Sequence, residues 1–221
     1  MTEPEPAKPR NAWRQWLAGG VVVVVAVAIT ASYLLSNAGP AGAAGCTPNL
    51  DAAALIDKAA GGALAGLEPT GKGRGYADLT FQGPDGKPAT LKDFAGKTLL
   101  VNFWATWCIP CRAEMPALAT LAQKYDGPDF MVLPINLDIG SSGADKAKQF
   151  LKDAKADTLP LYADPTMQTF DKLKTGAVTL GLPTSLLLDR KACEIAVLQG
   201  PAAWDGADGS KVVEALKGIK T

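Results

Sequence analysis

Two cysteines, Cys108 and Cys111, are separated by two residues in the segment Trp107-Cys-Ile-Pro-Cys111. The pair is predicted to open a helix that runs to about Tyr125. The first turn of a helix has unpaired N–H groups and the positive end of the helix dipole. Both stabilise a thiolate, so the pKa of Cys108 is expected to lie below that of a free thiol. Because a thiolate attacks disulfides and Cys111 lies one turn away, the pair predicts thiol–disulfide exchange.

Other chemistries fit the same pair less well. The chain has no histidine, which excludes Ser–His and Cys–His nucleophile pairs and histidine-ligated zinc or copper sites. A four-cysteine zinc site would show two closely spaced pairs, and the chain has only one. A thiol peroxidase needs Pro and Thr ahead of its reactive cysteine, and only Thr106 is present. A copper carrier that holds Cu(I) between Cys108 and Cys111 remains the alternative function.

The composition is that of an ordinary globular protein. Of the 221 residues, 48% are apolar and 20% are charged, and the formal net charge is zero. This length suggests one or two domains, and the charge balance gives no indication of a nucleic-acid partner. The sequence predicts no cofactor and no metal.

The amino-terminal region predicts a membrane anchor. Lys8, Arg10 and Arg14 precede an uncharged run of 19 residues, Leu17–Leu35, which is long enough to span a bilayer as a helix. By the positive-inside rule, residues 1–16 form a cytoplasmic tail. A small, flexible linker at 36–45 then leads to one domain at 46–221, outside the membrane.

Two alternatives to an uncleaved anchor stay open. Ala41-Gly-Ala43 fits a signal cleavage site, which would release the domain in soluble form. Gly45-Cys46 is a poorer match to a lipoprotein acylation site, because ten residues separate it from the apolar run.

Strands and helices are expected to alternate along the domain and to form a mixed central sheet flanked by helices on both faces. The patterns predict strands at 77–82, 87–91, 97–105, 130–138, 159–163, 184–188 and 193–198. They predict helices at 49–60, from the cysteine pair to 125, at 143–157, 164–174 and 210–219.

Three further expectations concern a helix cap, a loop and a proline within a strand. Thr47 and Pro48 suit the N-cap and first position of the first helix. The glycine-rich stretch 66–78 is expected to be a loop. Pro134 lies inside a predicted strand and removes a ladder hydrogen bond, so that strand is expected to be an edge or bulged strand.

The chain resembles the thioredoxin superfamily. It is most similar to the membrane-anchored, periplasm-facing branch of TlpA/ResA/CcmG-like reductases, and nearest to the TlpA type, because the additional cysteines match that pattern too. The resemblance is carried by Leu99–Ala105, Trp107–Cys111, Arg112–Pro116 and Gly181–Thr184. It implies a thioredoxin-like α/β fold on the periplasmic side of a bacterial inner membrane.

The resemblance also assigns roles to residues. It implies that Cys108 is the nucleophile, that Cys111 is the resolving thiol, and that Pro183 is a cis proline packed against the pair. The backbone of Leu182 would then pair with an extended segment of the partner. The plainer interpretation of Pro183 is a strand start after a turn.

Further residues are expected beside the pair. Trp107, Ile109 and Pro110 are predicted to bind the partner together with Leu182, whereas Trp104 is expected in the core. Pro110 also fixes φ early in the helix and limits the motion of the disulfide ring.

Glu114 is the predicted proton acceptor of the site. Thioredoxins proper carry a buried Asp where this chain has Asn102, and a neutral amide cannot take a proton from Cys111. Glu114 lies three residues past Cys111, on a neighbouring face of the same helix. Its alternative role is that of a solvated glutamate that complements the helix dipole.

Cys46 and Cys193 have no close cysteine neighbour in the sequence. Outside the cytoplasm they could pair, and the resemblance supports this structural disulfide. The alternative is two unpaired, buried thiols.

The resemblance implies a monomeric reductase of periplasmic disulfide-containing proteins, such as cytochrome-maturation or copper-assembly factors. A transmembrane thiol reductant would rereduce it. The direction of transfer depends on a reduction potential that the sequence does not contain.

Overall fold

The computed structural model of the protein describes residues 45–219. The predicted tail 1–16, the anchor 17–35 and all but the last residue of the linker lie outside this range. Between residues 45 and 219, no helix has the length and apolar character needed to cross a bilayer.

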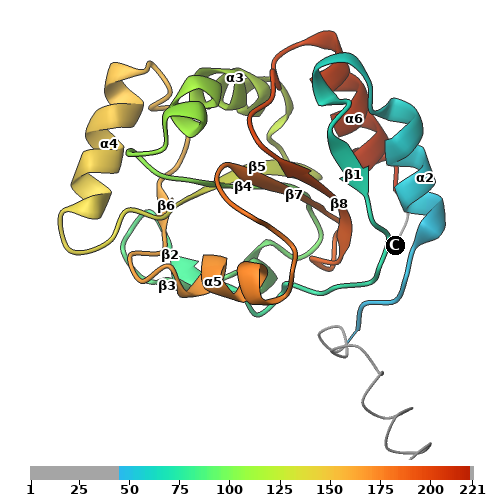
Figure 1. Ribbon diagram of the computed structural model, residues 1–221, viewed down its shortest axis with the longest axis horizontal. Coiled ribbons are helices and arrows are strands. Elements are labelled where there is room, and N and C mark those ends of the chain that lie inside the picture. Colours follow the sequence, from blue (N-terminus) through green and yellow to red (C-terminus); the bar gives the residue numbers. More distant parts are fainter. Residues whose placement is uncertain (1–44, 220–221) are drawn as a thin grey trace, which may run out of the picture. The chain divides into compact units, whose positions relative to one another are not determined.

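One sheet of eight strands runs through the domain (Figure 1), in the order β1-β8-β7-β4-β5-β6-β2-β3. The central strand β4 pairs parallel with β5 and antiparallel with β7, so the sheet is mixed, as predicted. The strands are β1 (Leu67–Pro69), β2 (Thr80–Gln82), β3 (Pro88–Thr90), β4 (Thr98–Trp104), β5 (Phe130–Asn136), β6 (Tyr162–Ala163), β7 (Thr184–Leu188) and β8 (Glu194–Gln199).

Helices cover both faces of the sheet, and each face has its own apolar core. Figure 1 shows α3 and α6 on one side of the central strands and α5 on the other. The first core includes buried side chains of α2, α3, α4 and α6, and the second includes those of α5 and the β2 region. The helices are α2 (Leu50–Ala59), α3 (Ile109–Tyr125), α4 (Gly143–Asp153), α5 (Gln168–Thr175) and α6 (Ala207–Lys217), with short 3₁₀ turns at Gly62–Leu64 and Leu91–Phe94.

The strand β4 is buried along its whole length. Alternate side chains of a strand point to opposite faces, and here Leu100 and Trp104 join the core under α3, while Val101 and Phe103 join the other core. The same period turns Asn102 toward α3. A polar side chain is therefore buried directly beneath the helix that carries the cysteine pair.

The strand β5 only partly fits the expectation for Pro134. It is an inner strand, in continuous register with β4, and no bulge interrupts that pairing. Its pairing with β6 begins only at Ile135. Over its first five residues β5 therefore has one ladder partner, and the missing N–H of Pro134 is tolerated there.

The amino-terminal expectations need two corrections. The first helix, α2, begins at Leu50 rather than after Thr47, because the side chain of Asn49 caps it by accepting from Ala52 N at 3.0 Å. The predicted loop 66–78 contains the edge strand β1, which pairs antiparallel with β8. Three residues between Gly66 and Thr70 carry too weak a pattern to predict a strand.

Several later elements are shorter than predicted, among them α4, which ends at Asp153 instead of 157. The helix α5 begins at Gln168 instead of 164, since Asp164 forms a turn whose carboxylate accepts from Thr166 N and Thr169 N. The strand β6 is limited to two residues instead of 159–163.

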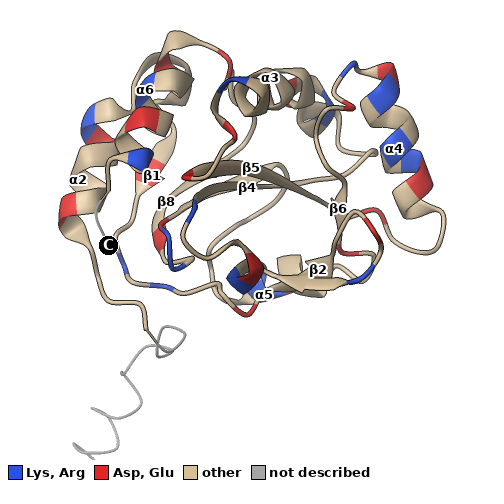
Figure 2. Cartoon of the chain, turned by 180° about the vertical axis from the view of Figure 1, so that it is seen from behind, with Lys and Arg blue, Asp and Glu red and all other residues tan. Residues whose placement is uncertain are grey.

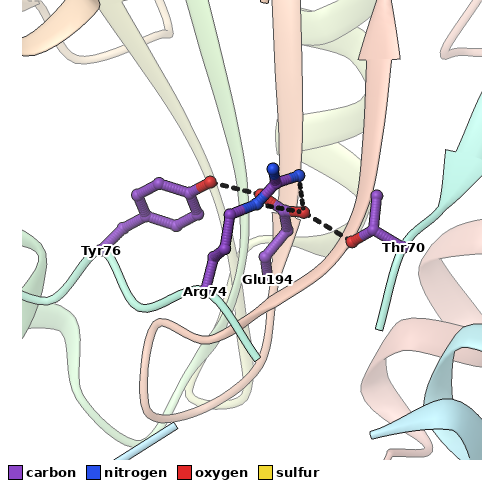
Figure 3. A network of polar contacts seen from close by, with 4 residues as sticks. All are labelled: Thr70, Arg74, Tyr76 and Glu194. Atoms are coloured by element: carbon purple, nitrogen blue, oxygen red, sulfur yellow. Dashed lines mark hydrogen bonds and ion pairs between the residues drawn. The ribbon is translucent and has the colours of Figure 1, made fainter. Parts of the chain in front are cut away.

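A buried polar cluster holds the segment after β1 against β8 (Figure 3). The carboxylate of Glu194 accepts hydrogen bonds from the Thr70 hydroxyl at 2.5 Å, from the Arg74 guanidinium and from the Tyr76 hydroxyl. The side chain of Glu194 has no exposed surface, so these donors replace the water that the charge loses on burial.

A disulfide joins Cys46 to Cys193, the residue before Glu194, with a Cα–Cα distance of 5.6 Å. The alternative of two unpaired thiols does not hold in this structure. Together, the disulfide and the Glu194 cluster attach the amino-terminal segment to the end of the sheet.

Candidate active site

The cysteine pair lies where β4 gives way to α3, and it forms a disulfide with a Cα–Cα distance of 5.3 Å. Cys108 is the N-cap of α3, and its sulfur accepts a hydrogen bond from Cys111 N at 3.3 Å. This is the helix-terminal position that the sequence predicts. An unpaired N–H of the first turn is thus directed at the sulfur that would become a thiolate on reduction.

The two cysteines differ slightly in exposure to solvent. Cys111 is fully buried, whereas Cys108 keeps 6% of its surface exposed. A partner can therefore reach the sulfur of Cys108 first. This difference agrees with the expected order, in which Cys108 attacks first and Cys111 acts from inside.

The predicted docking residues Trp107, Ile109 and Pro110 are exposed beside this sulfur, Trp107 by 62% and Ile109 by 79%. Trp104 is buried in the core under α3. Side chains of this size are seldom left in water without a reason, and a cluster of them is typical of a protein–protein contact.

The loop before β7 supplies the other side of the site. The Leu182–Pro183 peptide bond is cis, as the resemblance implies. Thr184 pairs with Phe103, which brings this loop to the end of β4 where the cysteines begin. Within residues 45–219 the backbone of Leu182 makes no hydrogen bond, so its N–H and C=O are available to an extended partner segment.

Glu114 is buried, with only 3% of its surface exposed. Its carboxylate accepts from Asn102 Nδ2 at 2.8 Å and from Ala202 N at 3.1 Å. The interpretation of Glu114 as a solvated glutamate is therefore wrong. The amide of Asn102 also donates to Ser185 Oγ at 3.0 Å, which links the helix of the cysteines to β7.

Burial raises the pKa of Glu114 to about 7, although its hydrogen bonds with Asn102 and Ala202 favour the ionised form. The indole N–H of Trp204 lies close enough to favour the ionised carboxylate as well, but the contact does not meet the geometry of a hydrogen bond. A carboxyl that titrates near neutral pH can both accept and return a proton.

The loop between β4 and Cys108 is held by Asp138, which follows β5. Its carboxylate accepts from Thr106 N at 3.1 Å and from Thr106 Oγ1 at 2.9 Å. Asn136 Nδ2 donates to the same carboxylate at 2.8 Å. Because β4 and β5 are parallel, their carboxyl ends meet at one edge of the sheet, and this contact fixes the chain two residues before Cys108.

Sequence reasoning missed several residues that the fold brings to the site. Asp138, Ser185, Ala202 and Trp204 all come from segments outside the cysteine motif. Leu180, which is 90% exposed, stands two residues before Leu182 and could have been noticed as an apolar residue in the same glycine-rich loop. The other four residues carry no local sequence signal, because only the order of strands in the sheet brings them to the cysteine pair.

The part of the chain that the structure describes brings no third metal ligand to the pair. Across residues 45–219, no group of three or more cysteine, histidine or acidic side chains is arranged to hold a metal ion.

Comparison with known families identifies the chain. The model of the family described as Redoxin matches residues 72–216, which is more than half of the sequence. The chain belongs to the Redoxin family. The matched region of this Redoxin protein runs from the segment before Arg74 almost to the end of α6 and includes both halves of the site.

Individual relatives agree with the family. The Redoxin chain is 32% identical over 120 residues to the thioredoxin-like protein YneN of Bacillus subtilis (strain 168), covering 54% of this chain and 66% of that protein. It is 34% identical over 116 residues to the thiol-disulfide oxidoreductase ResA of Bacillus thuringiensis subsp. konkukian (strain 97-27), covering 52% and 62%. The match thus spans just under two thirds of these curated relatives.

A solved structure agrees as well. The DsbE-type thiol:disulfide interchange protein of Chlorobium tepidum shares 30% sequence identity with a TM-score of 0.52, covering 64% of this Redoxin chain and 96% of that one. These similarities support the thioredoxin-like fold, the TlpA/ResA/CcmG branch and thiol–disulfide oxidoreductase activity.

Proposed function

We propose that this protein is a membrane-anchored, extracytoplasmic dithiol reductase that acts on disulfides of partner proteins. The observation that carries the proposal is the position of Cys108: it caps α3, accepts a backbone hydrogen bond from Cys111 and is flanked by exposed apolar side chains. The similarity to thiol–disulfide oxidoreductases supports the same chemistry.

The reaction consists of two exchanges. In the reduced protein, the thiolate of Cys108 attacks one sulfur of the partner disulfide, and the other partner sulfur leaves as a thiolate. Cys111 then loses its proton and attacks the Cys108 sulfur of the mixed disulfide, which releases the second partner sulfur. The partner gains two electrons, and the protein ends in the Cys108–Cys111 disulfide form that the structure shows.

Glu114 is suited to the second exchange. It lies one helical turn from Cys111, and side chains at this spacing are neighbours on a helix surface. Asn102 and Ala202 hold its carboxylate in place, and its pKa of about 7 lets it accept the thiol proton at neutral pH and release it afterwards.

Replacing Glu114 with Gln tests this role. The rate of mixed-disulfide resolution should fall by about 10²-fold near pH 8, because the variant lacks the base. In the parent protein the rate should rise as pH passes through about 7, and in the variant this step should vanish. Rapid-mixing measurements of the resolving step across pH 5–9 would show it.

Protein stability provides the control. Since the pKa of Glu114 is raised from 4.5 to about 7, the folded state binds more protons than the unfolded state between these values. The parent should therefore lose stability as pH rises through that window, and Glu114→Gln should lose less. A variant that folds, shows the altered stability profile and yet keeps the parental pH–rate profile would rule out the catalytic role.

The cellular role is proposed from the branch. Residues 1–16 would be cytoplasmic, 17–35 would anchor the chain, 36–45 would be a linker, and the domain at 46–221 would face the periplasm of a bacterial inner membrane. Partners would be cytochrome-maturation or copper-assembly proteins, with a transmembrane thiol carrier as electron source. The Cys46–Cys193 disulfide supports a relationship to the TlpA type in particular.

Trapping the partner tests the function directly. In the full-length chain produced in its own cell, Cys111→Ser should accumulate mixed disulfides through Cys108, because the resolving thiol is gone. The captured proteins should be extracytoplasmic and should contain paired cysteines. The double variant Cys108→Ser/Cys111→Ser is the control and should capture none. If Cys111→Ser traps no protein, the proposed function is wrong.

A further inference from the structure

A groove of about 530 Å³ lies between α3 and α4, beside the loop that leads to Cys108. Arg112 directly follows Cys111, so one wall of the groove begins next to the disulfide. We call this feature the α3–α4 groove. Its lining includes Thr106, Arg112, Lys146, Gln149, Phe150 and Asp153.

The groove presents two cations that lack a carboxylate partner. Arg112 and Lys146 are exposed, and neither is within 4.0 Å of an acidic oxygen anywhere between residues 45 and 219. The acid in the lining, Asp153, instead accepts a hydrogen bond from Gln149 at 2.8 Å. Figure 2 shows basic residues along α4 and on α3, the two helices that form the walls.

The guanidinium of Arg112 is also held in position. It lies 5.1 Å from the centroid of the Phe150 ring. That ring packs in turn on Trp104 of the core, with 5.6 Å between the centroids. A guanidinium stacked on a fixed ring loses little freedom when it binds an anion, and its planar fork matches the two oxygens of a carboxylate.

We infer that the α3–α4 groove binds an acidic side chain of the partner protein close to the partner's reactive cysteine. This inference rests on the proposed function, because the partner must place its disulfide at Cys108. Arg112 lies four positions after Cys108, which is a rise of about 6 Å along a helix, and an extended chain covers that distance in about two residues. The Asp or Glu of the partner therefore lies about two positions from the cysteine that is attacked.

The loop before β7, on the other side of Cys108, does not block this binding mode. The partner backbone can pair with Leu182 on the β7 side of Cys108, while its acidic side chain turns toward α3 and α4. Backbone pairing is indifferent to sequence, so the groove supplies a selectivity that the exposed backbone of Leu182 cannot.

Three synthetic peptides test the inference. Each contains one internal disulfide, and they differ only in the residue two positions from the attacked cysteine, which is Glu, Gln or Lys. At low salt the reduced protein should react with the Glu peptide about fivefold faster than with the Gln peptide. It should react with the Lys peptide more slowly than with the Gln peptide. The difference should shrink in 0.5 M salt, because screening weakens exposed charge pairs.

Variants of the groove sharpen the test. Arg112→Gln and Lys146→Gln should each lower the ratio of the Glu to the Gln rate constant, and the double variant should bring it to about one. The ratio cancels any effect of the Arg112 charge on the thiols themselves. Lys148→Gln, an exposed lysine of α4 outside the groove lining, is the matched control and should keep the parental ratio.

The outcomes separate the two proposals. If the parent reduces all three peptides at one rate, or the double variant keeps the parental ratio, the groove does not bind an acid and the inference is overturned while the reductase function stands. If no peptide is reduced, the proposed function fails and the inference with it.

Discussion

Replacing Cys108 with Ser should lower the second-order rate constant for reduction of a protein disulfide by at least about 10³-fold. Loss of a catalytic nucleophile has costs of this order or larger. A serine at the N-cap of α3 would still accept the hydrogen bond from Cys111 N, so the helix start should survive. The hydroxyl does not ionise near neutral pH and cannot form a mixed disulfide. The variant should therefore fold normally and be inactive.

The comparison with Cys111→Ser makes this prediction specific. That variant keeps Cys108, the less buried of the two cysteines, so its first exchange should proceed at a rate close to that of the parent and then stop at the mixed disulfide. Stopped-flow measurement of the first exchange, with mass spectrometry of the product, distinguishes the two. Equal loss of the first exchange in both variants would mean that the difference in exposure between Cys108 and Cys111 does not determine which sulfur attacks.

Removing the second disulfide should have the largest effect on stability. The double variant Cys46→Ala/Cys193→Ala should lower the free energy of unfolding by about 5 kcal/mol in the chain-entropy model, because the two residues are 147 positions apart. This is a large part of the 5–15 kcal/mol that is typical of a whole domain. The melting temperature should fall by about 10–20 °C for a domain of this size. Thermal and urea unfolding of the oxidised protein would measure the loss.

The active site should be unaffected in the same variant. Cys46 and Cys193 belong to the amino-terminal attachment, and the Glu194 cluster and the pairing of β1 with β8 still hold that segment. Disulfide reduction by the variant below its melting temperature should therefore match that of the parent. A loss of less than about 1 kcal/mol would show that the disulfide does not restrict the unfolded chain as the model assumes.

Local patterns predicted most of the sheet and the helix of the site. The apolar run at 97–105 became β4, and the cysteine pair became the start of α3, because a buried central strand and a helix N-terminus each have a strong local signal. The short elements did not follow such patterns. The strand β1 exists because β8 offers it an edge, and the start of α2 is set by Asn49, whose amide competes successfully with Thr47 for the cap.

The sequence alone predicted which atoms are expected to react. The spacing of Cys108 and Cys111 and their place at a helix start do not depend on distant parts of the chain. The family resemblance added the cis bond before Pro183 and the pairing of Cys46 with Cys193, both of which the structure contains.

Only the tertiary structure decided the environment of those atoms. Glu114 is held by Asn102 of β4 and by Ala202 N after β8, and its burial between these segments raises its pKa although both hydrogen bonds oppose that shift. The α3–α4 groove likewise needs two helices that are separate in the sequence. Burial and long-range contacts depend on how the sheet orders its strands, and no local spacing encodes that order.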